Sequence, residues 1–178
     1  MKNIVGKYVY LFLIAGTLIA LDQWTKSLVR ANLELGGSWL PESLAWLSPY
    51  ARIVHWYNTG AAFGMFQGGS MIFMVLAFVV VGAIIYYFPQ VEQQDWTLRL
   101  ALSMQLAGAL GNLLDRLQFD GRVTDFISVG TFPVFNIADA SISVGTVILL
   151  LGVYLQERAA HKAKATETPQ SNELTTSE

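Results

Sequence analysis

The sequence contains no cysteine and unusually few charged residues. Without cysteine, the 178-residue chain has no disulfides, no thiolate metal sites and no cysteine nucleophile. Charged residues make up only 13% of the chain and hydrophobic residues 53%, whereas a soluble domain carries roughly 25% charged residues. The net charge of -2 and the lack of a basic stripe argue against nucleic-acid binding. This composition predicts a membrane protein.

Four apolar stretches are long enough to cross a bilayer. A spanning helix needs roughly 20 residues, and four such lengths do not fit easily into the core of a soluble protein this short. The basic start before the first stretch is also typical of a cleaved signal peptide, but no convincing cleavage site follows, so we expect a retained helix. The sequence predicts a mainly α membrane protein, a four-transmembrane-helix bundle with helices at about 8-29, 71-88, 96-114 and 137-156.

Four crossings place both chain ends on the same side of the membrane. Lysines precede the first helix, and Arg158, Lys162 and Lys164 follow the last. The positive-inside rule then predicts that both termini are cytoplasmic, although several other basic residues would lie outside. We expect one integral membrane domain over residues 1-164 and a disordered, polar cytoplasmic tail over residues 165-178.

The longest connection, residues 30-70, is rich in tryptophan and tyrosine, which favour the membrane-water interface. Two short apolar runs at 51-57 and 61-66 flank the turn-like segment 58-60 and read as strands. We therefore expect a small, mobile extracytoplasmic β-platform lying on the bilayer. The connection at 89-95 is expected in the cytoplasm, and the connection at 115-135 outside.

Polar residues gather at one end of the expected bundle. The first and third helices run outward and the fourth begins outside, so the polar residues near these three ends share the outer leaflet. Charges at membrane depth are expensive and usually face a bundle interior or a wet cavity. We expect one polar cavity near the outer face, built from Asp22, Lys26, Asn112, Asp115, Arg116, Asp125, Asn136 and Asp139.

Few kinds of chemistry are open to this cavity. Of the two histidines, His161 is expected in the cytoplasmic tail, and His55 has no accompanying nucleophile elbow. No HExxH motif is present, and Lys26 and Arg116 disfavour a carboxylate site for a divalent cation. Acid-base chemistry by carboxylates remains, with no metal and no cofactor. Two close aspartates share a proton, so one can activate water while the other polarises a peptide carbonyl.

Each charged residue also has a structural interpretation. Asp115 and Arg116 could form a salt bridge at the helix end. Asp22 and Lys26 are spaced i,i+4, as in a local ion pair on one helix face. Asp139 lies at a helix start, where the helix dipole stabilises a negative charge.

The uncharged candidates have structural interpretations of the same kind. Asn136 could cap the fourth helix, and Gly60 could serve only a tight turn. Gly108 and Gly111 could let helices approach closely.

Five ordered blocks resemble the bacterial lipoprotein signal peptidases, also called type II signal peptidases. Together they cover residues 8 to about 157, and their order on four membrane helices is highly specific. One departure is Ala107, where the family often has a second glycine. The blocks are Asp22-Gln23-Trp24-Thr25-Lys26, Asn58-Thr59-Gly60-Ala61-Ala62-Phe63, Gly108-Ala109-Leu110-Gly111-Asn112-Leu113-Leu114-Asp115-Arg116, Val123-Thr124-Asp125-Phe126 and Phe135-Asn136-Ile137-Ala138-Asp139.

The resemblance implies an aspartic endopeptidase with Asp125 and Asp139 as its catalytic pair. The substrates it implies are diacylglyceryl prolipoproteins, cut just before the lipidated cysteine. It implies that substrate-pocket positions are occupied by Asn58, Gly60, Asn112, Arg116 and Asn136. It implies that mainly structural positions are occupied by Asp22, Lys26 and Asp115.

The resemblance also implies a setting and partners. The location is the bacterial inner (plasma) membrane, with the active site at the outer face. Membrane lipids surround the bundle, globomycin-type cyclic peptides inhibit it, and we expect a monomer.

Two other functions fit parts of the sequence. An ion-coupled carrier would use membrane carboxylates, but its charges are expected near the bilayer midplane rather than at one end. A lipid-binding or assembly factor would need no catalysis, and substitution of the two aspartates separates it from an enzyme.

Overall fold

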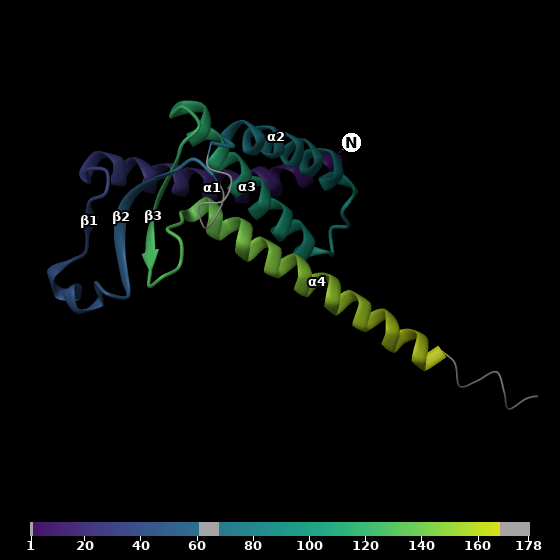
Figure 1. Cartoon of the computed structure of the whole chain (residues 1–178). Coiled ribbons are helices and arrows are strands. Elements are labelled where there is room, and N and C mark those ends of the chain that lie inside the picture. The colour runs from purple at the N-terminus through teal and green to yellow at the C-terminus, as the bar shows by residue number, and fades with distance from the viewer. Residues whose placement is uncertain (1, 61–67, 168–178) are drawn as a thin grey trace, which may run out of the picture.

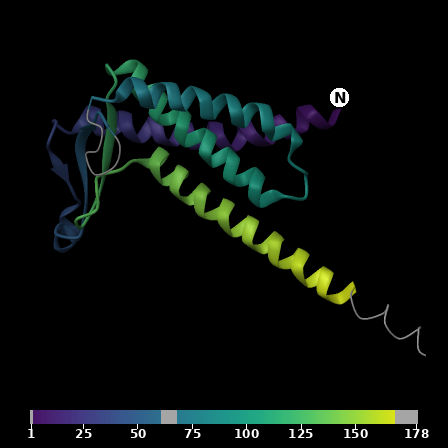
Figure 2. The same ribbon diagram turned by 45° about the vertical axis from the view of Figure 1, so that its right-hand side comes forward.

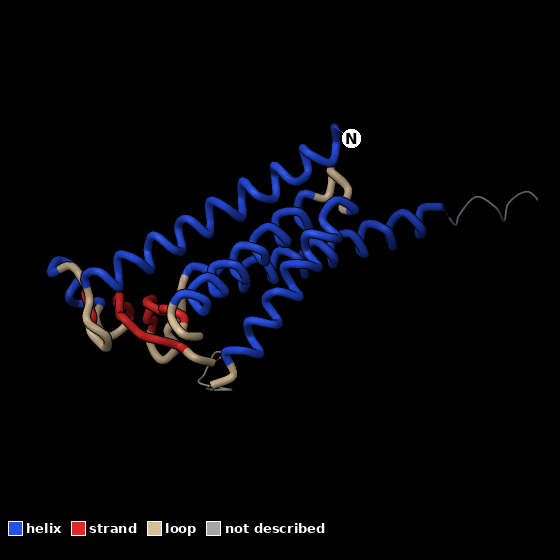
Figure 3. Tube along the Cα trace, turned by 90° about the horizontal axis from the view of Figure 1, so that it is seen from above, coloured by secondary structure: helices blue, strands red, loops and turns tan. Residues whose placement is uncertain are grey.

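The computed structural model describes residues 2–60 and 68–167. Four long helices run along the molecule, and a small sheet lies at one end (Figures 1 and 3). We call this the sheet end. The opposite end, which we call the far end, contains the start of α1 and the connection from α2 to α3 (Figure 1). The helices are α1 (Lys2–Asn32), α2 (Ser70–Tyr87), α3 (Trp96–Gln118) and α4 (Ile137–Glu167), with the 3-10 turns η1 (Glu42–Leu47) and η3 (Phe88–Gln90).

By length and composition, three of the described helices are able to cross a membrane. They cover Val5–Asn32, Ser70–Gln90 and Ile137–Arg158. The helix α3 is long enough but carries charges at both ends, so the expected count of four spans is met by only three helices on this criterion. The predicted helix positions are otherwise close, although α1, α3 and α4 extend beyond their predicted ends. The last eleven residues of the predicted tail, 168–178, lie outside the described residues.

The sheet has three antiparallel strands in the order β1, β2, β3. They are β1 (Ser38–Trp39), β2 (Ala51–Asn58) and β3 (Val123–Val129). The strand β2 confirms the predicted run at 51-57, whereas the run expected at 61-66 lies outside the described residues. The partner of β2 is instead β3, which was expected as a loop, and their register places Trp56 opposite Asp125. The expected small sheet therefore exists, but its central pairing joins two distant connections.

The helix α3 occupies the centre of the bundle. It packs against α1, α2 and α4, and α4 diverges from the other helices toward its C-terminus (Figure 2). The apolar core joins α1, α2, η3 and α3 through Leu11, Ala15, Ile84, Phe88, Leu106 and Ala107. Ala107 is thus a buried core residue, and its methyl group fits where the family often has glycine.

Two tight connections bring the sheet onto the bundle. Between α3 and β3, Asp120 and Gly121 both have positive φ angles, and a side chain at Gly121 would collide with Ser70. The Ser70 hydroxyl donates to the Gly121 carbonyl at 2.6 Å, which ties the start of α2 to this turn. Between β3 and α4, Phe135 pairs with Ile127 and returns the chain to the bundle. These turns bring β3 close to the start of α4, where the side chain of Asn136 donates to Asp125.

Candidate active site

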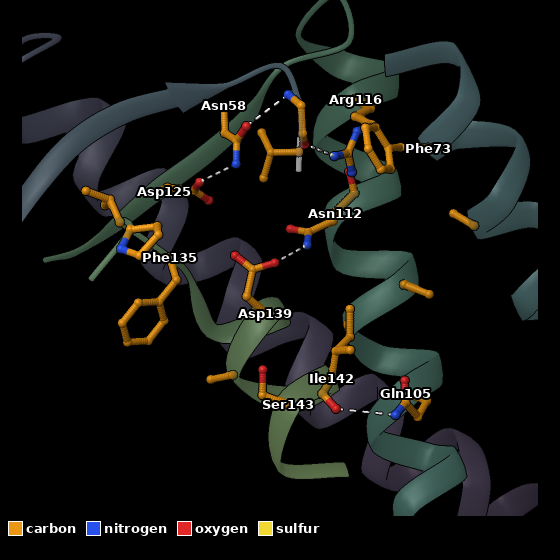
Figure 4. Close-up of a pocket in the computed structure, with 18 of the residues that line it drawn as sticks. Asn58, Phe73, Gln105, Asn112, Arg116, Asp125, Phe135, Asp139, Ile142 and Ser143 are labelled. Carbon is orange, nitrogen blue, oxygen red and sulfur yellow. Dashed lines mark hydrogen bonds between the residues drawn. The ribbon is translucent and has the colours of Figure 1, made fainter. Parts of the chain in front are cut away.

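Asp125 and Asp139 meet at the sheet end of the bundle. Asp125 lies on β3 and is only 1% exposed. Asp139 lies in the first turn of α4. Both residues line the same cavity, and Figure 4 shows Asp125 above Asp139 at its polar end. Residues 14 positions apart in the sequence are therefore brought together by the turn that follows β3.

Asn136 joins the two aspartates. Its side-chain amide donates to Asp125 Oδ1 at 2.7 Å, and its side-chain oxygen accepts from the backbone N–H of Asp139 at 2.9 Å. In return, Asp139 Oδ2 accepts from the backbone N–H of Asn136 at 3.2 Å. This reciprocal pair is a capping box, which satisfies two N–H groups at the helix start. The expected role of Asn136 as a helix cap is confirmed, and the same side chain also contacts Asp125.

Two further asparagines donate to the carboxyl groups. Asn58, at the end of β2, donates to Asp125 Oδ2 at 3.1 Å. Asn112, on α3, donates to Asp139 Oδ1 at 2.7 Å, and its own oxygen accepts from Lys26 and Asn136. Each aspartate thus receives a hydrogen bond from the side-chain amide of a residue on another element, and Figure 4 shows those from Asn58 and Asn112.

A second pair of carboxylates fixes the backbone beside the first. Asp115 Oδ2 accepts from the N–H of Thr124 at 2.8 Å, and Asp22 Oδ1 accepts from the N–H of Ala138 at 2.9 Å. Thr124 and Ala138 are the residues directly before Asp125 and Asp139. The carboxylate of Asp22, a residue of α1, also lies at the N-terminus of α4, where the helix dipole favours a negative charge. The two outer carboxylates therefore hold the main chain that carries the inner two.

Lys26 connects the second pair of carboxylates. Its residue is fully buried, and its ammonium lies 2.9 Å from Asp22 and 3.6 Å from Asp115. The i,i+4 pair between Asp22 and Lys26 is confirmed. The expected helix-end bridge between Asp115 and Arg116 is replaced, because Asp115 pairs with Lys26 and with Arg30 at 3.6 Å.

Gly60 and Arg116 form one wall of the polar part of the cavity, at the sheet end. The N–H of Gly60 donates to the side chain of Asn58 at 2.9 Å, which confirms the tight turn expected there. Arg116 donates weakly to the Gly60 carbonyl at 3.3 Å, and its guanidinium lies 5.3 Å from the centre of the Phe73 ring. Arg116 thereby links α3, α2 and the end of the β2 turn, as Figure 4 shows.

Three contributors to this network were missed by the sequence reasoning. Gln23 donates to Asp22, to the Gly111 carbonyl and to Asp115. Arg30 donates to the Thr124 hydroxyl at 2.8 Å. The spacing of Asp22, Lys26 and Arg30 at i, i+4 and i+8 was a usable signal for Arg30, because such residues share one helix face. Nothing in the local sequence pointed to Thr124.

The cavity has a volume of about 640 Å³ and extends from the aspartates down between the helices. Its walls are mostly apolar and come from α2, α3, α4 and residues 132–135. The glycine on α3 nearest α4 is required for this packing, since a Cβ at Gly108 would lie 2.5 Å from the Ala138 carbonyl oxygen. Gly111 is similarly close to Asp22. The apolar walls include Leu76, Ala77, Val80, Ala109, Phe135, Ala140, Ile142 and Val144.

The charges of the site favour one shared proton. Asp22, Asp115, Asp125 and Asp139 face three nearby cations, Lys26, Arg30 and Arg116, so the group is balanced when one carboxyl is protonated. Burial, together with the charge of Asp139, raises the pKa of Asp125 to about 7. Among the described residues, no group of three histidine or carboxylate side chains could hold a metal ion. The arrangement therefore offers one carboxyl as an acid beside one carboxylate as a base.

Comparisons with known proteins agree along nearly the whole chain. A family model described as Signal peptidase (SPase) II matches residues 14–155. A lipoprotein signal peptidase of Halalkalibacterium halodurans is 38% identical over 86% of this chain and 97% of its own length. One from Enterococcus faecalis is 34% identical over 86% of this chain and 92% of its own length.

Solved structures agree with the sequence comparisons. A bacterial membrane enzyme determined at 2.3 Å by the in meso method is 29% identical, covers 92% of this chain and 93% of its own, and superimposes with a TM-score of 0.71. A second bacterial membrane enzyme, determined at 1.9 Å, has 31% identity and a TM-score of 0.69 over 80% of this chain and 91% of its own. The chain belongs to the signal peptidase II family.

Proposed function

We propose that this protein is an aspartic endopeptidase that removes signal peptides from diacylglyceryl-modified prolipoproteins, cutting before the lipidated cysteine. Family membership gives the reaction class, since signal peptidase II enzymes process prolipoproteins. The observation that carries the aspartic mechanism is the pair Asp125 and Asp139, which share Asn136 and line one cavity.

In the proposed mechanism, Asp125 is the acid and Asp139 the base. The raised pKa of Asp125 supports a proton on that carboxyl near neutral pH. Asp139 accepts hydrogen bonds from the Asn112 side chain and from the backbone N–H of Asn136, which hold its carboxyl group at the cavity. Asp139 takes a proton from water, and the resulting hydroxide attacks the peptide carbonyl carbon. Asp125 donates its proton to the carbonyl oxygen, which gives a tetrahedral gem-diol with no covalent enzyme intermediate. Asp139 then gives its proton to the amide nitrogen as the C–N bond breaks. Asp125 takes a proton back from a gem-diol hydroxyl as the carboxylic acid product forms, so both carboxyls return to their starting states.

We propose that the remaining polar residues of the cavity bind and orient the substrate. An extended peptide beside Asp125 and Asp139 can form hydrogen bonds with amide and guanidinium groups. Contacts within the protein already fix the orientation of these groups. The same groups offer a binding site for globomycin-type inhibitors. These substrate-binding residues are Asn58, Gly60, Asn112, Arg116 and Asn136.

The apolar cavity suits a substrate that is itself a membrane helix with a lipid next to the scissile bond. The lower walls from α2 and α4 carry aliphatic side chains, so a signal helix can lie beside them without leaving an apolar environment. The polar end would then receive the segment that must be extended for hydrolysis. Closing this end to bulk water strengthens the electrostatic contacts of the transition state.

We propose that α3 is a fourth span within one membrane domain of residues 1-164. Both termini would be cytoplasmic and the sheet end outside, in the bacterial inner membrane, with the protein active as a monomer. The central position of α3 supports this, because Asp115, a buried charge of α3, pairs with Lys26 inside the bundle rather than facing lipid.

The absence of native cysteine makes the topology simple to test. Trp46→Cys and Gln93→Cys each introduce the single thiol of the chain. An impermeant maleimide added to intact cells should label position 46 and not position 93. The reverse pattern would overturn the proposed orientation.

The decisive test of function is cleavage of a purified diacylated prolipoprotein. Asp125→Asn and Asp139→Asn keep the size of each side chain but remove the carboxyl chemistry, so each should lower turnover by at least about 1,000-fold. Thermal unfolding in detergent should remain cooperative in both variants. Near-normal turnover by Asp139→Asn would exclude the aspartic mechanism, and Asp120→Asn, in an exposed ion pair with Arg122, is the matched control.

A further inference from the structure

Arg99 is a buried cation at the far end of the bundle, away from the aspartates. It lies in the first turn of α3, and its residue is only 8% exposed. A charged group at this depth requires a compensating partner, because a buried charge without one is strongly unfavourable.

The surroundings of Arg99 are aromatic rather than acidic. Its guanidinium carbon lies 4.6 Å from the centre of the Tyr10 ring and 5.4 Å from that of Phe88. Among the side chains that the structure describes, no carboxylate lies within ion-pair distance of Arg99, and its Nε atom has no hydrogen-bond partner. The two rings hold the guanidinium plane in place through cation–π contacts but supply no anion.

The nearest acid along the chain is already engaged. Asp95 caps α3 by accepting from the Leu98 N–H at 3.0 Å, and it also accepts from Thr97 and Gln156. A second cation, Lys7, donates to the carbonyl oxygens of residues 89 and 91, which are neutral acceptors. At the far end, Arg99 and Lys7 are thus held by neutral groups, Asp95 faces other partners, and Glu92 is exposed.

Two cations of the sheet end, the buried Lys26 and the half-buried Arg30, are arranged differently. Lys26 contacts both Asp22 and Asp115, and Arg30 contacts Asp115. The fold thus pairs Lys26 and Arg30 with carboxylates, whereas Arg99 has no carboxylate partner among the described side chains and its Nε has no acceptor. An anion from outside the chain would give Arg99 the partner that the described chain does not supply.

We propose that Arg99 binds the phosphodiester of a membrane phospholipid at the far end of the bundle, with a preference for anionic headgroups. Guanidinium matches the geometry of phosphate oxygens and is readily stacked on aromatic rings. Basic pockets between membrane helices bind anionic lipid headgroups in the same manner. Lys7, on the neighbouring helix, adds to the positive potential and favours a lipid without a headgroup amine. This site is separate from the peptidase cavity and does not depend on the proposed catalytic mechanism.

The first test uses the wild-type protein alone. In detergent, added phosphatidylglycerol should raise the melting temperature, whereas diacylglycerol with the same acyl chains, which lacks the phosphate, should not. Inorganic phosphate distinguishes the two sources of the anion. Equal stabilisation by diacylglycerol would overturn the phosphate contact, and equal stabilisation by inorganic phosphate would overturn the assignment to a lipid.

The second test localises the site. Native mass spectrometry should show about tenfold weaker phosphatidylglycerol binding to Arg99→Gln, as expected for the loss of one charge-assisted contact. Arg122→Gln, which alters an exposed arginine beside Tyr57 at the sheet end, should bind as the wild type does. Unchanged lipid affinity in Arg99→Gln would overturn the proposal. If that variant does not fold, Arg99→Lys should still show weaker binding, because a lysine lacks the planar fork, and unchanged binding would count equally against the site.

Discussion

The helices α2 and α3 lie side by side but have opposite characters. The helix α2 contains no charged residue, and its mean hydropathy of 2.6 over Ser70–Gln90 is the highest among the described spans, yet only Ile84 within it is buried. The helix α3 contains Arg99, Asp115 and Arg116 and is buried along most of its length. Hydropathy thus readily identifies α2, the helix with the most exposed apolar surface. It gives little indication that α3 lies at the centre of the site.

The physical reason is that lipid is as apolar as a leucine side chain. Apolar surface gains little when one membrane helix packs on another, so close packing and polar contacts determine which helix is central. Gly108 and Gly111 allow α1 and α4 to approach α3, and Asn112 and Asp115 of α3 bond to side chains of those neighbours. On α2 the residues at the cavity serve mainly as an apolar wall.

The largest effect should come from removing a charge of α3. Asp115→Ala should lower the free energy of unfolding by about 3–5 kcal/mol, because it leaves Lys26 and Arg30 without a shared buried partner. On α2, Ser70→Ala removes one hydrogen bond and should lower it by about 1 kcal/mol. Chemical denaturation in a matched detergent measures both, and equal losses would contradict the proposed asymmetry between the helices.

A smaller effect is expected from adding one methyl group to each helix. Gly108→Ala should destabilise the protein by about 1–3 kcal/mol, because its Cβ would collide with backbone and side-chain atoms of α4. Gly82→Ala on α2 meets no atom within 4 Å and should not destabilise it. Thermal unfolding distinguishes the two variants, and a stable Gly108→Ala protein would mean that α3 and α4 can separate without loss.

The dependence on pH tests the polar end of the cavity. With the pKa of Asp125 raised to about 7, its proton is lost as the pH rises, so turnover should fall about tenfold between about pH 6 and pH 8. Stability should change in the same direction. A carboxyl whose folded pKa is raised contributes stability at low pH, and this contribution is lost as the pH rises toward 7. Asp125→Asn should flatten the stability profile, and a profile that is unaltered by this substitution would assign the titration to another group.

The smallest effect concerns the apolar wall from α2. Ala77→Phe would narrow the cavity and should raise KM about threefold, with little change in kcat, because it weakens substrate and transition-state binding alike. Val75→Phe lies on the exposed face of α2, outside the cavity lining, and is the matched control. Identical KM values for the two variants would indicate that the substrate does not contact α2.

The sequence was informative where the physical signal is local. Continuous apolar runs gave the positions of α2 and the starts of α3 and α4 closely. The strand β3 was missed because its first four residues are all buried, so no alternation marks it, and because its partner strand is distant in the sequence. The catalytic candidates came from the family blocks, not from spacing alone.

Ion pairing within the site was predicted only in part. The pair Asp22 and Lys26 shares a helix face and was recoverable from i,i+4 spacing. Asp115 and Arg116 are consecutive, and consecutive residues on a helix do not face each other. The true partners of Asp115 come from α1, so they depend on how two helices pack. Such contacts cannot be read from one helix.

The reciprocal cap between Asn136 and Asp139 makes one member of the proposed catalytic pair part of the start of a helix. The four residues from 136 to 139 set both where α4 begins and which way its carboxylate points. Inserting a single residue between them would rotate Asp139 by about 100° around the helix axis, away from Asn112. Substitutions within the preceding turn leave this register intact. A graft of the site into another membrane bundle should therefore carry the whole helix start as one unit, rather than an isolated aspartate.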